Sequence, residues 1–391
     1  MKTIIILLCC VTSVTEIFSQ HQDFKISGYL QAQYQYGEKD ASLKVGGGNS
    51  DKNHDFNRIG VRRGRLKFEY EKKIASGVFQ IDLTEKGVGL KDAYLLVKMP
   101  ALGKSSIKTG VFNRPFGFEI SHSSSRRLSP ERSTVVTTLF PEERDLGAML
   151  TLQADQSPWS MFKLELAAIA GNGIKMDIDN RKDYIGHLSL NKKLTDKSVL
   201  NAGISYYNGG VYQGTSNVYK YGILNNYSGN IGKFAKREYY GVDAQFKIST
   251  VLGATYIYSE YILGTQTGDK NSSKSPNYSA LPTNDTYIRN FRGGYITVEQ
   301  DLGLLPLSVV AKYDFYDPNN KIYKDEVGLD GSAKGDIAYQ TFGCGLNWKI
   351  NENMNATAYY EWITNERSTN LTAYNQDIDD NVFTLRLQYK F

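Results

Sequence analysis

The chain has 391 residues, enough for two ordinary domains or for one large all-β domain. Its formal net charge is +5, its mean hydropathy is −0.41, and no stretch reaches the ~18 consecutive apolar residues that a membrane-spanning helix requires. The 28 Tyr and 36 Gly against only 9 Pro favour many strands and turns over a helical bundle.

The N-terminal segment has the pattern of an export signal. Lys2 precedes the apolar run 4–11, and small and polar residues then lead to Ser19. A charged start, a short apolar segment and a small residue for cleavage define a secretory signal peptide. We therefore predict a signal peptide over residues 1–20, cleaved at its end, and one mature domain over residues 21–391.

The cysteines add a constraint on the mature chain. Cys9 and Cys10 fall within the predicted signal peptide, and a lipoprotein anchor on either is disfavoured because the apolar segment before them is too short. Cys344 alone remains, so an intramolecular disulfide is excluded and the sheet itself must supply the stability. Cys344 sits in an alternating run, which favours a strand position over a thiol nucleophile.

Apolar and polar residues alternate from one end of the mature chain to the other, which is the signature of strands with one apolar and one polar face. The clearest alternating runs cover residues 25–36, 65–70, 79–83, 92–99, 162–166, 187–191, 242–248, 341–349 and 383–391. Taking each alternating run as one strand gives about 16 strands, an even number. The strands near 197–210 and 250–264 are the least distinct.

The connections between these strands alternate in length. The short set comprises residues 72–76, 101–103, 155–158, 195–197, 303–306 and 351–353. The other set is mostly long and rich in Gly, Asn, Asp and Ser: residues 38–57, 117–144, 211–236, 264–290, 318–336 and 366–379. Tight turns at one end and long loops at the other describe a transmembrane antiparallel β-barrel, with the short turns on the periplasmic side.

A soluble β-sandwich also alternates, but three features favour the barrel. The chain carries a predicted export signal, its polar faces hold charges within the strands, and the long–short loop rhythm persists throughout. A sandwich would also need a second apolar face for its core. The weak overall hydropathy is expected, because strands of a barrel are only half apolar.

Several segments resemble one known family. The segments are "SSIKTGVFNRPFGFE" and "SSSRRLSPERSTVVTTLFPEERDLGAML" within residues 104–150, together with "ISGYLQAQYQY", "IGVRRGRLKFEYE" and "GLKDAYLLVKM". They are similar to the phosphate-selective porin O and P family of Gram-negative outer membranes. The resemblance implies a water-filled outer-membrane channel, in some members selective for anions or polyphosphate, and a homotrimer.

The chain ends on "FTLRLQYKF", in which apolar and polar residues alternate up to the last position. In a closed barrel the last strand must pair with the first, so a polar, frayed tail would leave an open edge. We expect Tyr389 and Phe391 in the aromatic girdle at the periplasmic interface. A terminal aromatic residue of this kind also resembles the signal that the barrel-insertion machinery recognises.

The long connection over residues 117–144 is the first candidate functional region. In porins with this layout the third loop folds into the lumen and narrows it. Fork-shaped guanidinium groups suit phosphate and carboxylate, so arginines here predict an anion path. The alternative is that these arginines pair with nearby carboxylates and pin the loop to the wall. The arginines are Arg126, Arg127, Arg132 and Arg144, and the carboxylates are Glu119, Glu131, Glu142, Glu143 and Asp145.

The second strand carries a column of cations. Arg63, Arg65 and Lys67 share the parity opposite to Leu66, so we expect them to face the lumen and to raise the local anion concentration. The alternative is pairing with the carboxylates of neighbouring strands. Arg62 falls on the lipid parity, which predicts a position at a rim or a subunit interface.

No catalytic or metal-binding pattern stands out. The four histidines lack metal spacing, Asp177–Asp183 lacks the Gly and terminal Glu of a calcium loop, and no nucleophile elbow surrounds the serines at 123–125. We expect no enzyme activity and no cofactor. Arg292-Gly293-Gly294 occurs once, so no nucleic-acid partner is expected.

The sequence thus predicts an outer-membrane porin for small hydrophilic solutes, with anions such as phosphate preferred. Its expected partners are outer-membrane lipids, small anions and the insertion machinery. Two alternatives stay open: a barrel adhesin that acts through the loops 211–236 and 264–290, and a soluble exported β-protein that binds polysaccharide.

Overall fold

The computed structural model of the protein describes residues 23–391. The predicted signal peptide and its cleavage site lie outside the described residues. Within the described range, no helix is long and apolar enough to cross a membrane.

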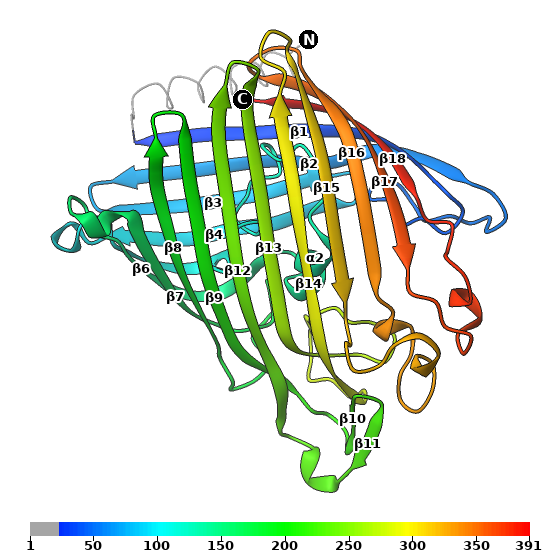
Figure 1. Cartoon of the computed structure of the whole chain (residues 1–391). Coiled ribbons are helices and arrows are strands. Elements are labelled where there is room, and N and C mark those ends of the chain that lie inside the picture. The colour runs from blue at the N-terminus through cyan, green and yellow to red at the C-terminus, as the bar shows by residue number, and fades with distance from the viewer. Residues whose placement is uncertain (1–22) are drawn as a thin grey trace, which may run out of the picture.

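Sixteen antiparallel strands form one closed barrel, so the predicted fold class is confirmed. Each strand pairs with the next, and β1 pairs with β18 to close the sheet (Figure 1). The strands are β1 (Phe24–Gly37), β2 (Phe56–Lys72), β3 (Ala75–Thr84), β4 (Gly87–Lys98), β5 (Ser106–Asn113), β6 (Arg144–Leu152), β7 (Phe162–Ile169), β8 (Asp183–Thr195), β9 (Ser198–Tyr212), β12 (Phe234–Thr250), β13 (Gly253–Gly268), β14 (Thr286–Asp301), β15 (Leu307–Asp317), β16 (Tyr339–Lys349), β17 (Met354–Asn365) and β18 (Val382–Lys390).

The two least distinct predicted strands are present as β9 and β13, which pair with β12 over nearly their whole length. Two further strands, β10 (Asn217–Lys220) and β11 (Ile223–Asn226), form a hairpin in the loop between β9 and β12. β10 runs parallel to the start of β14, so this loop is fastened to the rim of the barrel (Figure 1).

Alternation places one face of each strand inside the barrel. In β1, Gln31 is fully buried and Gln33 is 1% exposed, whereas the neighbouring Leu30, on the other parity, is 47% exposed. A soluble protein would bury the leucine and expose the amides. The reversed pattern follows from a bilayer outside the barrel and polar partners inside it.

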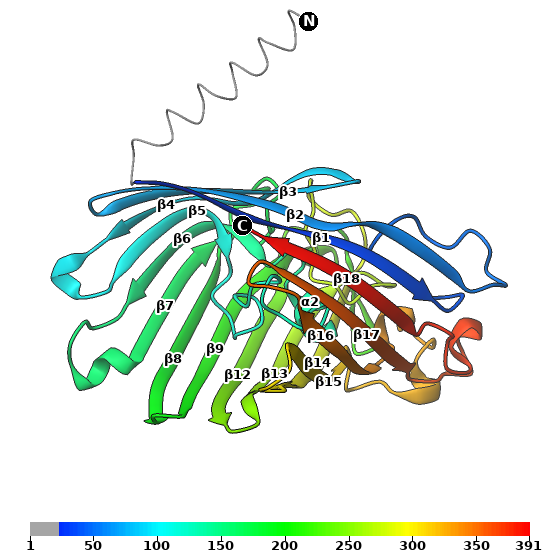
Figure 2. The same cartoon turned by 90° about the horizontal axis from the view of Figure 1, so that it is seen from above.

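The C-terminus lies at the short-turn end, where the end of β18 pairs with the first half of β1 (Figure 2). Phe391 and Gly28 exchange two backbone hydrogen bonds of 3.0 Å, so the pairing continues to the last residue. A Cβ on Gly28 would lie 2.6 Å from the Phe391 ring, so this glycine leaves the space that the ring occupies. Tyr389 and Phe391 are both about half exposed on the outer face.

Three irregularities interrupt the register of the described barrel strands. One lies at Leu194 beside the turn between β8 and β9, and the other two fall on cations. Gln31 pairs with Arg63 and the next residue pairs with Val61, which leaves Arg62 as the extra residue of β2. Lys91 is the extra residue of β4 in the same way. A bulge shifts the parity of its strand by one residue, so Arg62 joins Arg63 inside the barrel. The prediction that Arg62 lies at a rim or subunit interface was therefore wrong.

The third connection at the long-loop end, residues 114–143, folds into the barrel and carries the short helix α2 (Thr134–Leu139) (Figure 1). Its apolar side chains, among them Phe116, Val136 and Phe140, pack on inward aromatics of the wall such as Tyr239 and Phe291. This hydrophobic cluster lies inside the barrel, so the loop is a fixed part of the lumen.

Deletion of Phe391 should lower the yield of assembled barrel several-fold. The deletion removes two backbone hydrogen bonds at the β1–β18 seam and the ring above Gly28. The folded fraction can be measured by the heat-dependent shift in gel mobility that barrels show. Channels that do form should keep their single-channel conductance, because Phe391 faces outward. Phe391→Tyr is the control that retains the ring, and an unchanged yield on deletion would contradict this role of the seam.

Candidate functional site

Glu131 in loop 114–143 gathers three arginines from β2 and β18, the two strands that flank β1. Its carboxylate accepts two hydrogen bonds from Arg62, of 2.7 and 2.8 Å, and one of 2.9 Å from Arg63, both on β2. Arg386 on β18 reaches the same carboxylate at 3.2 Å. Arg386 also donates to the Gln33 side chain of β1, so one carboxylate ties the loop to the barrel seam.

The Glu131 carboxyl stays ionised in this place. Burial by itself would raise its pKa, but the charges of Arg62, Arg63 and Arg386 outweigh burial and hold the pKa well below its usual range. One carboxylate facing three guanidinium groups leaves a surplus of positive charge. The Arg62 side chain is 25% exposed, and it is the most accessible of the three arginines.

Arg127 adds a further cation next to this cluster. Its guanidinium donates to the backbone carbonyls of Ser129 at 3.2 Å and Pro130 at 3.3 Å, and its Nη1 has no hydrogen-bond partner. Within residues 23–391, no carboxylate lies within 4.0 Å of it. Burial, followed by the charge of Arg132, lowers the pKa of Arg127 to about 9, so the group is still charged at neutral pH.

Arg132 and Arg144 pair with carboxylates and fix the loop. Arg132 donates to the backbone carbonyl of Glu119 at 2.8 Å and forms an ion pair with Glu143. Arg144, at the start of β6, contacts Glu143 at 2.6 Å and Asp92 of β4 at 3.2 Å. The charges of Arg132 and Arg144 overcome the effect of burial and keep the pKa of Glu143 far below its usual range.

The remaining predicted residues also fall into two groups, those with a carboxylate partner and those without one. Arg65 lies 3.5 Å from Asp82, and Lys67 lies 2.7 Å from Glu69. Arg126 is exposed, and no carboxylate lies within 4.0 Å of it in the part of the chain that the structure describes. Of the seven predicted residues, Arg63, Arg65, Lys67, Arg132 and Arg144 thus have carboxylate partners, whereas Arg126 and Arg127 do not.

The opposite wall of the barrel holds the loop through carboxylates. Glu260 of β13 accepts the backbone N–H of Phe118 at 2.6 Å, and the hydroxyl of Tyr295 at 3.0 Å. Asp314 of β15 accepts the backbone N–H of Thr134 at the start of α2, at 3.1 Å. Loop 114–143 therefore lies between a basic seam at β1, β2 and β18 and an acidic wall at β13 and β15.

The central positions of Glu131, Arg62 and Glu260 were not predicted from the sequence. Strict alternation placed Arg62 on the lipid side of the barrel, because a bulge leaves no reliable mark in a single sequence. Glu131 is one of four carboxylates in loop 114–143, and only the fold distinguishes it from the exposed Glu142. Arg386 falls on the polar parity of the alternating C-terminal run, but its partner 255 residues away leaves no trace in the sequence.

Among residues 23–391, no group of three or more His, Cys, Asp or Glu side chains could hold a metal ion. Cys344 is a free, half-buried thiol on β16.

The barrel resembles solved outer-membrane proteins in fold. It matches OprB of Pseudomonas putida with a TM-score of 0.63 at 11% identity, covering 96% of each chain. It matches the outer membrane channel DcaP of Acinetobacter baumannii with a TM-score of 0.56 at 13% identity, covering 94% of this chain and 97% of that one. OmpT of Vibrio cholerae, in its trimer form, gives 0.54 at 9% identity, covering 94% and 99%.

A search of curated protein sequences gives no match. The model of the family described as phosphate-selective porin O and P matches residues 26–391, which is nearly the whole described chain. The matched residues include β2 and β18, which carry the arginines around Glu131, and also loop 114–143. Together with the closed barrel and its inward-folded loop, this shows that the chain belongs to the phosphate-selective porin O and P family and is an outer-membrane porin.

Proposed function

We propose that this porin passes small hydrophilic solutes by passive diffusion and prefers anions, with phosphate or a similar oxyanion as the favoured solute. The observation that carries this proposal is the three-to-one ratio of arginines to carboxylate at Glu131. Arg127 lies beside the cluster and adds to its positive charge. A positive surplus within a low-dielectric wall raises the local concentration of anions.

The arginines act in two ways in this proposal. Arg62 and Arg126 touch the passing anion, because they are partly or fully exposed. Arg63, Arg127 and Arg386 are buried, and they set the potential from behind the surface. Since the contact is made by few exposed donors, an anion binds strongly enough to enter and weakly enough to leave.

The setting of the channel follows from the same proposal. Residues 1–20 would direct export and be removed, and residues 21–391 would insert as one barrel through recognition of Tyr389 and Phe391. The outward band of exposed apolar residues would contact membrane lipids. A homotrimer is supported by the similar fold of OmpT, which is described as a trimer.

The ion preference is measurable in a planar bilayer under a KCl gradient. The reversal potential should have the sign of chloride selectivity, because the seam carries surplus positive charge. Arg62→Gln should move the potential toward zero, whereas Lys104→Gln, on an exposed short turn, should leave it unchanged. A reversal potential of the opposite sign would contradict the anion preference.

The variant Glu131→Gln tests how the loop is held. Loss of one partner of a buried ion pair costs about 3–5 kcal/mol, so the loop should detach from the seam. The single-channel current should then fluctuate between levels, while the anion preference is retained or increased.

The matched control for this variant is Glu142→Gln. Glu142 lies in the same loop, is exposed, and has no ion pair within 4.0 Å among the described residues. This control should give a steady current like that of the parent protein. A steady current in Glu131→Gln as well would show that the arginine contacts do not hold the loop.

A further inference from the structure

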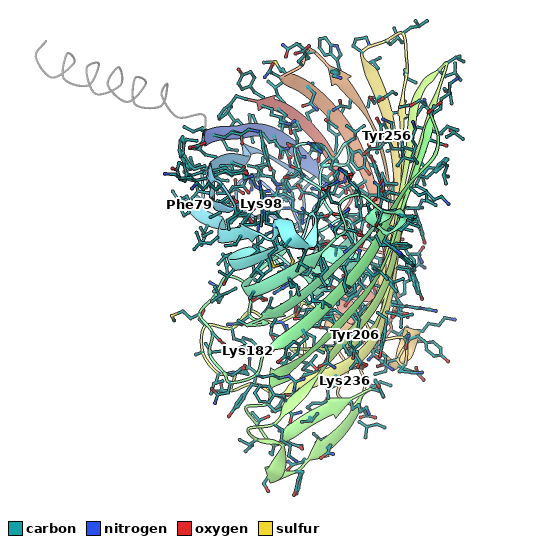
Figure 3. All side chains as sticks on the ribbon, turned by 90° about the vertical axis from the view of Figure 1, so that its left-hand side faces the viewer. Phe79, Lys98, Lys182, Tyr206, Lys236 and Tyr256 are labelled. Carbon is teal, nitrogen blue, oxygen red and sulfur yellow. The ribbon has the colours of Figure 1, made fainter. Side chains whose placement is uncertain are left out.

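A cavity of about 710 Å³ lies in the lumen at the short-turn end of the barrel. Its wall consists of inward side chains from strand ends between β9 and β18, and loop residues 118–128 border it toward the middle of the barrel. Figure 3 places Tyr256 of this wall near the short turns, at the opposite end of the barrel from Lys236. Small-molecule sites occupy about 300–1,000 Å³, so the cavity can hold a solute.

One side of the cavity is a row of aromatic rings. Phe118 stacks on Tyr258 with ring centroids 5.2 Å apart and an angle of 16° between planes. His122 lies 5.4 Å from Tyr258, and Tyr256 continues the row at 6.3 Å and 19°. Burial, followed by the charge of Arg127, lowers the pKa of His122 to about 4, so its ring is neutral at pH 7. Phe118 belongs to the loop and stacks on Tyr258, so packing of the loop explains this ring pair. Tyr256 instead stacks on Tyr258 of its own strand.

Four cations line the same cavity: Arg126, Lys247, Lys349 and Lys390. None of them has a carboxylate within 4.0 Å in the described part of the chain. Lys247 lies over the ring of Tyr256 at 5.3 Å, so a charge and an aromatic face are presented together. This contrasts with the arginines of the seam, most of which have carboxylate partners.

The carboxylates of the cavity already have donors. Asp301 accepts the hydroxyl of Ser308 at 2.7 Å. Glu299 accepts the backbone N–H of Leu128 at 3.4 Å and the Tyr258 hydroxyl at 3.5 Å. Glu352 lies on an exposed turn at the margin. Four cations against three carboxylates leave the lining with a net positive charge.

Amide side chains complete the lining. Gln245, Asn347, Asn355 and Gln388 come from four different strands, and the side-chain oxygen of Asn355 is buried without a hydrogen-bond partner. An amide carries both donors and an acceptor, which suits the hydroxyl groups of a sugar. Aromatic faces are electron-rich and pack against the C–H groups of a pyranose ring.

We propose that this cavity is a binding site for a phosphorylated sugar, with the ring on the Tyr256–Tyr258 row and the phosphate at Arg126 and Lys247. This inference rests on the proposed channel function, because the solute reaches the site through the lumen. Inorganic phosphate would engage only the cations, and a neutral sugar only the rings and amides. A sugar phosphate engages both and so binds more tightly than either.

The test is block of the single-channel current by glucose 6-phosphate, inorganic phosphate and glucose, each titrated from either side of a bilayer. Glucose 6-phosphate should block at the lowest concentration, and faster from the short-turn side. Tyr256→Leu should weaken its block about three- to tenfold and leave block by inorganic phosphate unchanged. Arg126→Gln should weaken block by both phosphates, and Lys104→Gln, on the exposed turn outside the cavity, should weaken neither.

Bilayer recording reports only assembled channels, so a variant that folds poorly does not mimic lost binding. Equal block by glucose 6-phosphate and inorganic phosphate would overturn the inference, and so would unchanged block in Tyr256→Leu. Either result would leave the reversal potential, and with it the anion preference, unaffected. A cation-selective reversal potential would instead defeat the channel proposal itself.

Discussion

Closure of the sheet through the β1–β18 pairing is the constraint on which the rest of the structure depends. A strand edge inside a bilayer would leave backbone N–H and C=O groups without partners, at several kcal/mol each. The pairing therefore runs to Phe391, whose ring occupies the space above Gly28. Once the barrel is closed, every second side chain must face an enclosed lumen, and the polar residues of sixteen strands must find partners there.

Loop 114–143 supplies many of those partners. Its apolar residues cover the inward aromatics of β9, β12 and β14, and Glu131 neutralises part of the charge on Arg62, Arg63 and Arg386. The same contacts that hold the loop also shape the electrostatics of the lumen. Buried ion pairs contribute little net stability, but breaking one is costly. They are suited to fixing the position of a loop rather than to stabilising the fold.

The lumen has two regions with different chemistry. At the seam, arginines are mostly paired and buried, so they act mainly through the potential they create. In the cavity at the short-turn end, cations are unpaired and lie beside aromatic rings and amides. The first arrangement can act on a solute through charge alone, whereas the second also offers surfaces that can respond to the shape and hydroxyl groups of a solute.

The sequence by itself determined the barrel, the orientation of most strand faces and the long and short ends, because each leaves a local pattern of alternation or composition, and it led to the inward loop only through the family resemblance. It also identified the family from segments within residues 26–150. Tertiary structure decided which charges meet. The bulge at Arg62, the choice of Glu131 over Glu142 and the cavity at Tyr256 depend on register and on contacts across the barrel. Such contacts join residues far apart in the chain, and a single sequence carries no periodic trace of them.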